Sequence, residues 1–370
     1  MKKVLIIGAG FVGQGVVEKL RKDPSFSITL INYTPEISYK PLYPDVAGGR
    51  LSPDVIEYPL ARYAAKKKID YVVGNVENID FSENIVCING TTLSYDYCVL
   101  APGVVTNFYG REELRAVTHV FDSLDDCRTL NKKVEGLITS DKRIIRIVII
   151  GGGYTGVEYV THLVKLLNKK GTSYEITIVE IAPEILGPLS VDVKKRVNEY
   201  LTECNVRVKT NAQVETITKD AVCLSDERIQ TDIVVWTAGM CGTQLCSQLD
   251  LPSKAGRIVI DATLRPQGMN NVFIAGDAAS LYRMAVPYAK QYAAQVVKNL
   301  RALEEGKTIQ PFQPKEYGYV IGLAGGEGLG EIMGMKMKGW YGFAFHYFMC
   351  FLTLLGKRNK IRFIASFFKS

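Results

Sequence analysis

Histidine and closely spaced cysteine are scarce in this sequence. It has three histidines in 370 residues, and its eight cysteines are scattered, with no CxxC pair and no Cys/His cluster. Structural zinc sites need about four such ligands at short spacing. We therefore expect no metal site, and we expect most of the cysteines to be ordinary reduced side chains.

The N-terminus also lacks a long apolar run. After Met1-Lys2-Lys3, the run that begins at Val4 ends at Gly8, which is too short for the apolar region of a signal peptide. We expect a buried first strand there. With 47% hydrophobic and 22% charged residues the composition is that of a globular protein, and the length predicts two to three domains.

Acidic residues are missing from the C-terminal segment. The whole chain has 45 Lys and Arg against 38 Asp and Glu, a net charge of +7. Residues 332–370 hold seven basic residues, ten aromatics and no acidic residue, so the excess lies entirely in this segment. This argues against nucleic acid as a partner and favours an anionic lipid surface, contacted by residues 336–370.

The apolar run within this segment is too short to cross a bilayer. Trp340–Leu355 has 16 residues, whereas a spanning helix needs about 20. We expect it to lie along a membrane surface, followed by a turn at Gly356–Lys360 and a second amphipathic piece at Ile361–Lys369. A dimerisation or core helix and a single spanning helix are the alternatives.

Two stretches share one pattern of apolar strand, Gly-rich turn, helix and second strand. The first runs from Lys3–Ile7 through the turn Gly8–Gly13 to Ser27–Asn32, and the second from Arg146–Ile150 through Gly151–Gly156 to Glu175–Glu180. Strand, helix and parallel strand within about 35 residues form a βαβ unit. The sequence therefore predicts an α/β fold with two Rossmann-like dinucleotide-binding domains.

Further elements are expected between and after these copies. Short strands are predicted near 70–76, 84–88, 97–101, 206–209, 221–225, 233–237 and 272–275, and a helix at about 285–304.

Glycines in such turns let backbone amides approach the phosphates of a dinucleotide at a helix N-terminus. The residue that ends the second strand contacts the ribose. Glu180 can accept hydrogen bonds from both ribose hydroxyls and repels a 2′-phosphate, which favours NAD over NADP. The equivalent residue of the first copy is Asn32, an amide without that charge.

Several segments resemble the type II NADH:quinone oxidoreductases, within the disulfide-reductase-type flavoproteins that have two dinucleotide-binding domains. The similar segments follow the family's order over nearly the whole chain. They are Tyr39–Gly48 with Leu51–Asp54, Leu100–Gly103, Gly151–Glu158, Val235–Gly239, Ala275–Ala278 and Gly356–Asn359.

The resemblance implies FAD in the first domain and NADH in the second. The implied FAD contacts are Gly8, Gly10, Phe11, Gly13, Asn32, Pro41, Val76, Ala101, Pro102, Gly103, Gly276 and Asp277, and the implied NADH contacts are Gly152, Gly153, Gly156 and Glu180. In the family, the residue matching Asp277 holds a ribityl hydroxyl, and the helix after it directs its dipole at the flavin.

The resemblance also implies the residues that carry the chemistry. Glu158 matches a glutamate that lies close to flavin and nicotinamide in the family. On the quinone side, Gln291 and Gln295 agree with the family's Ala-Gln-x-Ala-x-Gln, whereas Lys290 replaces its first Ala. His162 stands where many relatives have an acidic residue, and we expect it to be structural.

The leading hypothesis is a monotopic NADH:quinone oxidoreductase that pumps no protons, on the cytoplasmic face of the cell membrane. Residues 1–115 and 260–330 would bind FAD, 116–259 would bind NADH, and 331–370 would contact the membrane. A homodimer is left open.

Two alternatives remain open. A sulfide:quinone oxidoreductase has the same architecture but uses redox cysteines. None occurs at 128–203 or 247–349, although Cys241 and Cys246 could form such a pair. The other alternative is a membrane-docked flavoprotein that binds nucleotide as a sensor without turnover.

Overall fold

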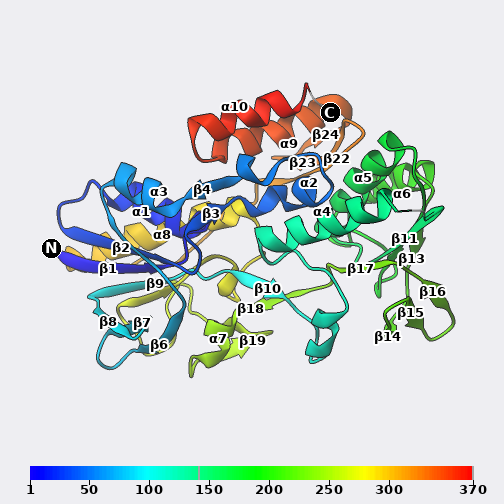
Figure 1. Ribbon diagram of the computed structural model, residues 1–370. Coiled ribbons are helices and arrows are strands. Elements are labelled where there is room, and N and C mark those ends of the chain that lie inside the picture. Colours follow the sequence, from blue (N-terminus) through cyan, green and yellow to red (C-terminus); the bar gives the residue numbers. More distant parts are fainter. Residues whose placement is uncertain (141, 369–370) are drawn as a thin grey trace. The chain divides into compact units, whose positions relative to one another are not determined.

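The computed structural model describes residues 1–140 and 142–368. The elements labelled in Figure 1 form two compact units. Unit 1 comprises Met1–Ser38, Tyr58–Val105 and Met240–Glu316, and unit 2 comprises Tyr39–Glu57, Thr106–Gly239 and Tyr317–Ser370. Both are α/β units with a parallel sheet, which confirms the predicted fold class.

These units differ from the predicted domain boundaries in two ways. Residues 39–57 and 317–330, expected in the FAD domain, belong to unit 2, and so does the segment 331–370, expected to stand apart. The reason is packing, because the helix at 43–47 contacts two helices of unit 2 and the strand at 318–323 pairs with the strand that supports the C-terminal helices. The chain changes unit after Val105 and Gly239, rather than near 115 and 259.

Unit 1 is built on a five-stranded parallel sheet of order β21-β9-β1-β2-β5. Apolar and β-branched residues at Val4–Ile7 bury β1 between β2 and β9. The strands are β1 (Lys2–Ile7), β2 (Phe26–Asn32), β5 (Asp70–Val73), β9 (Tyr97–Leu100) and β21 (Val272–Ile274).

Helices α1 (Phe11–Leu20) and α8 (Val286–Glu304) contact each other in this unit. The other elements that begin in or border unit 1 are β3 (Glu36–Ser38), β4 (Glu57–Pro59), α3 (Leu60–Lys67), β6 (Val76–Asp80), β7 (Ile85–Ile88), β8 (Thr91–Ser94), β10 (Val104–Thr106), β18 (Met240–Gly242), α7 (Gln244–Gln248), β19 (Ser253–Lys254), β20 (Arg257–Ile258) and the 3₁₀ turn η4 (Gly276–Ala278).

Unit 2 contains a four-stranded parallel sheet of order β13-β12-β11-β17. Its strands are β11 (Ile144–Ile150), β12 (Ser173–Val179), β13 (Val206–Lys209) and β17 (Ile233–Trp236). The other elements before the C-terminal segment are η1 (Lys40–Leu42), α2 (Tyr43–Ala47), η2 (Pro53–Val55), η3 (Glu112–Ala116), α4 (Leu124–Ile138), α5 (Tyr154–Lys169), α6 (Val191–Glu203), β14 (Val214–Ile217), β15 (Ala221–Leu224) and β16 (Arg228–Gln230).

The C-terminal segment of unit 2 combines an antiparallel sheet with two helices, drawn orange to red in Figure 1. They are β22 (Gly318–Leu323), β23 (Glu327–Ile332), β24 (Met335–Met337), α9 (Gly339–Thr353) and α10 (Lys357–Ser366). Two glycines allow α9 to lie against β23, since a Cβ on Gly342 would be 2.4 Å from the Gly328 carbonyl oxygen.

The predicted turn at Gly356–Lys360 is wrong, because α10 already begins at Lys357. The connection between the two helices is residues 354–356, where Gly356 has a positive φ of +83°. In the part of the chain that the structure describes, every helix is too short or too polar to span a membrane. Residues 369 and 370, which end the predicted docking segment, lie outside the described residues.

Candidate functional site

The first Gly-rich turn requires glycine for steric reasons. Gly8 has φ +107°, and a Cβ there would lie 2.2 Å from the carbonyl oxygen of Ala101. A Cβ on Gly13 would lie 2.0 Å from the Gly8 carbonyl oxygen. The turn, the start of α1 and the segment at Ala101–Gly103 are therefore brought together in unit 1 only because side chains are missing.

Open space lies beside the glycines that precede the two helices. Gly10 and Gly153 cap the N-termini of α1 and α5, and neither helix has a side-chain cap or an acidic residue in its first turn. A Cβ at either glycine would meet no protein atom within 4 Å. A helix N-terminus with its positive dipole end facing open space fits the pyrophosphate of a dinucleotide in each unit.

The residue at the end of each second strand is anchored to the turn of its own copy: Asn32 is the last residue of β2, and Glu180 directly follows β12. Asn32 accepts a hydrogen bond from the Ala9 amide at 3.1 Å through Oδ1. Glu180 accepts from the Gly152 amide at 2.7 Å through Oε2, and from the Ala182 amide at 2.9 Å through Oε1. Because a carboxylate has about four acceptor positions, Glu180 keeps capacity for ribose hydroxyls.

Asn32 has less capacity for a ribose. Its Nδ2 donates to the carbonyl and hydroxyl of Thr34 at 3.0 Å each and to the Glu36 carbonyl at 3.2 Å, and its side chain is buried. The amide therefore mainly fixes the loop after β2.

Glu158 lies in the second turn of α5, where its Oε1 accepts a long hydrogen bond of 3.3 Å from the Gly322 amide. Burial raises its pKa to about 8, and the negative charge of Asp45 contributes to the increase. The side chain therefore holds its proton at neutral pH.

A buried polar cluster that was not predicted surrounds Asp45 in unit 2. The Asp45 carboxylate pairs with Arg50 at 2.5 Å and accepts a hydrogen bond from the Tyr347 hydroxyl at 2.9 Å. His162 Nε2 lies 3.4 Å from the same carboxylate oxygen, and burial lowers the His162 pKa to about 4. His162 is therefore buried and neutral, and its predicted structural role stays a prediction.

The two glutamines expected on the quinone side bind the backbone of their own unit. Gln291 donates to the Lys315 carbonyl at 3.0 Å and accepts from the Lys315 amide at 2.8 Å. Gln295 donates to the Gln310 carbonyl at 2.9 Å. These hydrogen bonds hold residues 310–315 against α8. Direct contact of the two glutamines with a quinone stays a prediction. The role of Lys290, whose side chain is exposed, stays a prediction as well.

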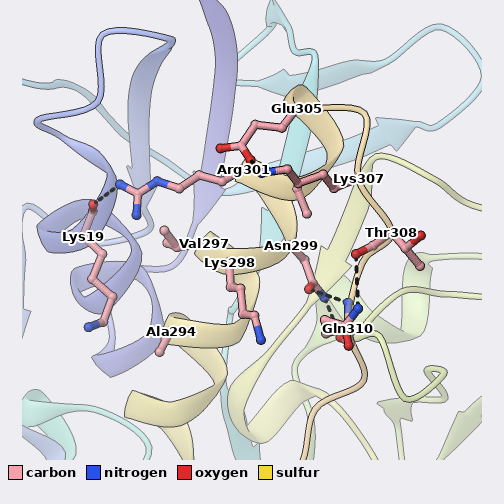
Figure 2. A pocket seen from close by; sticks show the side chains of 11 residues that line it. Lys19, Ala294, Val297, Lys298, Asn299, Arg301, Glu305, Lys307, Thr308 and Gln310 are labelled. Atoms are coloured by element: carbon pink, nitrogen blue, oxygen red, sulfur yellow. Dashed lines mark hydrogen bonds and ion pairs between the residues drawn. The ribbon is translucent and has the colours of Figure 1, made fainter.

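A cavity of about 580 Å³ lies near the C-terminal half of α8 (Figure 2). Asn299, fully buried, satisfies its amide with the carbonyls of Thr263 and Gln310. Arg301 pairs with Asp23, and Lys307 pairs with Glu305. The buried amide of Asn299 and the charged groups of Arg301 and Lys307 are thus already engaged by the protein.

The remaining predicted contacts lie in both units. A Cβ on Gly276 would lie 2.8 Å from Cγ2 of Val12, so this glycine lies beside the start of α1. Gly276 and Asp277 form η4 in unit 1, where Arg257 donates to the Asp277 carbonyl at 2.7 Å. Val76 begins β6 in a separate three-stranded sheet, and Pro41 lies in η1 of unit 2. Arg257 was not predicted, and no sequence pattern marks it.

The cysteines form no disulfide, and all eight lie within the described ranges. Cys246 is buried 3.6 Å from the Thr243 hydroxyl, and burial raises its pKa. No group of three or more His, Cys, Asp or Glu side chains with metal-binding geometry occurs among the described residues.

Comparison with known proteins gives three results. In curated proteins, the chain is similar to the type II NADH:quinone oxidoreductase of Staphylococcus epidermidis, with 26% identity over 368 residues and 91% of each chain covered. In solved structures, it is similar to NDH2 of Plasmodium falciparum in complex with NADH (TM-score 0.89, 17% identity, 100% of this chain and 98% of that chain). It is also similar to the sulfide:quinone oxidoreductase of Aquifex aeolicus (TM-score 0.83, 19% identity, 95% and 91%).

The two solved structures confirm the fold, and the curated relative confirms the predicted resemblance. A family model described as pyridine nucleotide-disulphide oxidoreductase matches residues 2–296. This match and the curated relative confirm the prediction of an oxidoreductase that uses FAD and NADH. The chain belongs to the pyridine nucleotide-disulphide oxidoreductase family.

Proposed function

We propose that this protein transfers electrons from NADH to a membrane quinone through FAD. The observation that carries the proposal is the Glu180 carboxylate, anchored 2.7 Å from the Gly152 amide beside the open N-terminus of α5. A fixed carboxylate at this position favours a ribose with two free hydroxyls over a 2′-phosphate. FAD held by the turn Gly8–Gly13 would supply the chemistry, because a flavin can take up a hydride and give up two electrons.

Glu158 is the proposed source of a proton. Reduction of a quinone to a quinol by NADH consumes one proton in addition to the hydride. Glu158 carries a proton at neutral pH because burial disfavours its charged form. We propose that it gives this proton to the reacting site and regains one from solvent, so that the reaction moves no proton across the membrane.

We further propose that the C-terminal helices attach the protein to the cytoplasmic face of the membrane. Tyr347 and Phe363 are buried, but both helices also expose large apolar side chains. These are Trp340, Tyr341, Phe348, Met349 and Leu352 on α9, Ile361 and Ile364 on α10, and Phe368 just after α10. Two exposed apolar faces flanked by basic residues suit the boundary between headgroups and acyl chains.

Part of the positive charge of this segment is neutralised within unit 2. Lys336 pairs with Asp192, and Arg362 pairs with Asp54. The net charge of the segment therefore overstates its electrostatic attraction to a membrane, and burial of the apolar faces is the larger contribution to the proposed attachment.

The second candidate is a sulfide:quinone oxidoreductase, favoured by the fold of the Aquifex aeolicus enzyme. Sulfide is a nucleophile, so this chemistry needs an accessible cysteine disulfide for it to attack, and the attack releases a cysteine thiolate. Cys246 fits this poorly, since it is buried with a raised pKa.

Anaerobic spectroscopy of the detergent-purified holoprotein separates the two candidates. Addition of NADH should bleach the flavin absorption, and a soluble quinone should restore it. Bleaching by sulfide but not by NADH would replace the first candidate with the second, and bleaching by neither would leave a nucleotide-binding sensor.

A further inference from the structure

A second cavity, of about 430 Å³, lies wholly within unit 2 and has a basic lining. Its charged side chains come from the loop after α2, from the C-terminal half of α5 and from α10. They are Arg50, Lys165, Lys169 and Arg362 against one carboxylate, Asp54, which pairs with Arg362. Because Arg50 pairs with Asp45 and Arg362 pairs with Asp54, the two lysines supply the excess of positive charge.

The two lysines of this lining have no acidic partner within 4.0 Å among residues 1–140 and 142–368. Lys165 is exposed, but partial desolvation lowers its pKa, and the neighbouring charges of Arg50 and Lys169 lower it further. The three cations therefore repel one another across the cavity, and an anion between them would relieve that repulsion.

Arg50 is held in place at the base of the cavity. Its guanidinium lies 4.1 Å from the centre of the Tyr347 ring and 4.3 Å from that of Phe367, and one terminal nitrogen binds Asp45. The other terminal nitrogen, Nη2, is buried and has no hydrogen-bond partner in the part of the chain that is described. A buried guanidinium nitrogen without a partner is a costly donor.

His162 lines the same cavity with a second unsatisfied atom. Its Nε2 faces Asp45 and its buried Nδ1 has no partner among the described residues. The ring is neutral because burial lowers its pKa to about 4. With the proton on Nε2, directed at the carboxylate, Nδ1 is an acceptor that suits a hydroxyl group.

We propose that this cavity binds a glycerophosphate group, with phosphate oxygens on Arg50, Lys165 and Lys169 and a hydroxyl on His162. Such a group is carried by an anionic lipid headgroup or by a free phosphate ester. The cavity near α8 does not make the same case, because its buried Asn299 amide is satisfied and none of its described side chains has a buried polar atom without a partner. The proposal does not depend on which electron donor the enzyme uses.

Titration calorimetry of the full-length holoprotein tests the site with two probes, sn-glycerol 3-phosphate and monomeric dihexanoyl phosphatidylglycerol. The variant K165Q/K169Q removes two exposed cations of the lining. The matched control K132Q/K133Q removes the same charge from α4, outside the lining. We expect the first variant to bind about tenfold more weakly or worse than wild type, and the control to bind like wild type.

The two probes identify the source of the phosphate. Tighter binding of the lipid probe assigns the site to a headgroup, and equal binding assigns it to a free ester; both support the site. Dihexanoyl phosphatidylcholine should bind more weakly than the phosphatidylglycerol, because its headgroup carries no net charge. Absence of binding by both phosphate probes, or equal affinity of K165Q/K169Q and wild type, would overturn the proposal.

Discussion

The substitution Asp45→Asn tests whether the buried cluster of unit 2 is a stability determinant. The side chains of Asp45 and Arg50 are 4% and 7% exposed, and their 2.5 Å contact is the only ion pair of Arg50 among the described residues. The amide keeps the shape of the carboxylate and can still accept from Tyr347, but it leaves the guanidinium buried without a counter-charge.

Breaking a buried ion pair by removing one partner costs about 3–5 kcal/mol. Because the amide retains one hydrogen bond, we expect the lower end, about 3 kcal/mol. In a unit of about 200 residues this lowers the unfolding midpoint by roughly 6–12 °C. The assay is thermal unfolding of the holoprotein followed by circular dichroism.

Two further variants make the test specific. Glu227→Gln breaks the partly exposed pairs with Arg207 and Lys209 and should cost at most about 1 kcal/mol. The double variant Asp45→Leu/Arg50→Met removes both buried charges and should recover much of the loss. If Asp45→Asn is no more destabilising than Glu227→Gln, the reasoning about the buried cluster is wrong.

Three other predictions follow from the structure. Burial raises the pKa of Glu158 in the folded protein to about 8, above its ordinary value of 4.5. The free energy of unfolding therefore falls as the pH rises from 4.5 toward 8, because the buried group loses its proton. The lowered pKa of His162 has the opposite effect on stability, but only below about pH 6.5. The glutamine of Glu158→Gln does not titrate, so the free energy of unfolding of the variant should rise by roughly 1–2 kcal/mol relative to that of wild type between pH 6.5 and 8.5. Plots of the free energy of unfolding against pH that run parallel for the two proteins would contradict this. Gly10→Ala should leave the unfolding midpoint of the apoprotein within a few degrees of wild type, because its Cβ meets no protein atom, yet lower FAD retention at least about tenfold by filling the phosphate space; full retention would refute that placement. Replacing the exposed Phe348, Leu352 and Ile361 with Ser should release the protein from anionic vesicles in a flotation assay, with ferricyanide reduction by NADH unchanged; undiminished flotation would exclude this docking face.

Local sequence patterns were sufficient to predict the two βαβ copies. Each copy needs only a buried strand, a glycine turn and a helix within about 35 residues, and the positive φ of Gly8 and Gly151 is a local requirement. The anchoring role of Glu180 follows from its place at the end of a strand, next to the turn of the same copy.

Contacts between distant segments could not be predicted in this way. Asp45, His162 and Tyr347 come from three separate parts of the sequence, and each is unremarkable by itself. Gln291 was interpreted through the quinone-side motif, whereas its amide binds the backbone of Lys315, a contact that depends on how the chain returns past α8.

The central claim is that NADH reduces a quinone through this protein without proton translocation. It is tested most directly in sealed proteoliposomes that contain the holoprotein, a short-chain quinone and an internal pH indicator. We predict one quinol formed for each NADH oxidised and no change of internal pH beyond that of protein-free vesicles. NADH oxidation without quinol formation, or quinol formation that requires sulfide, would contradict the account.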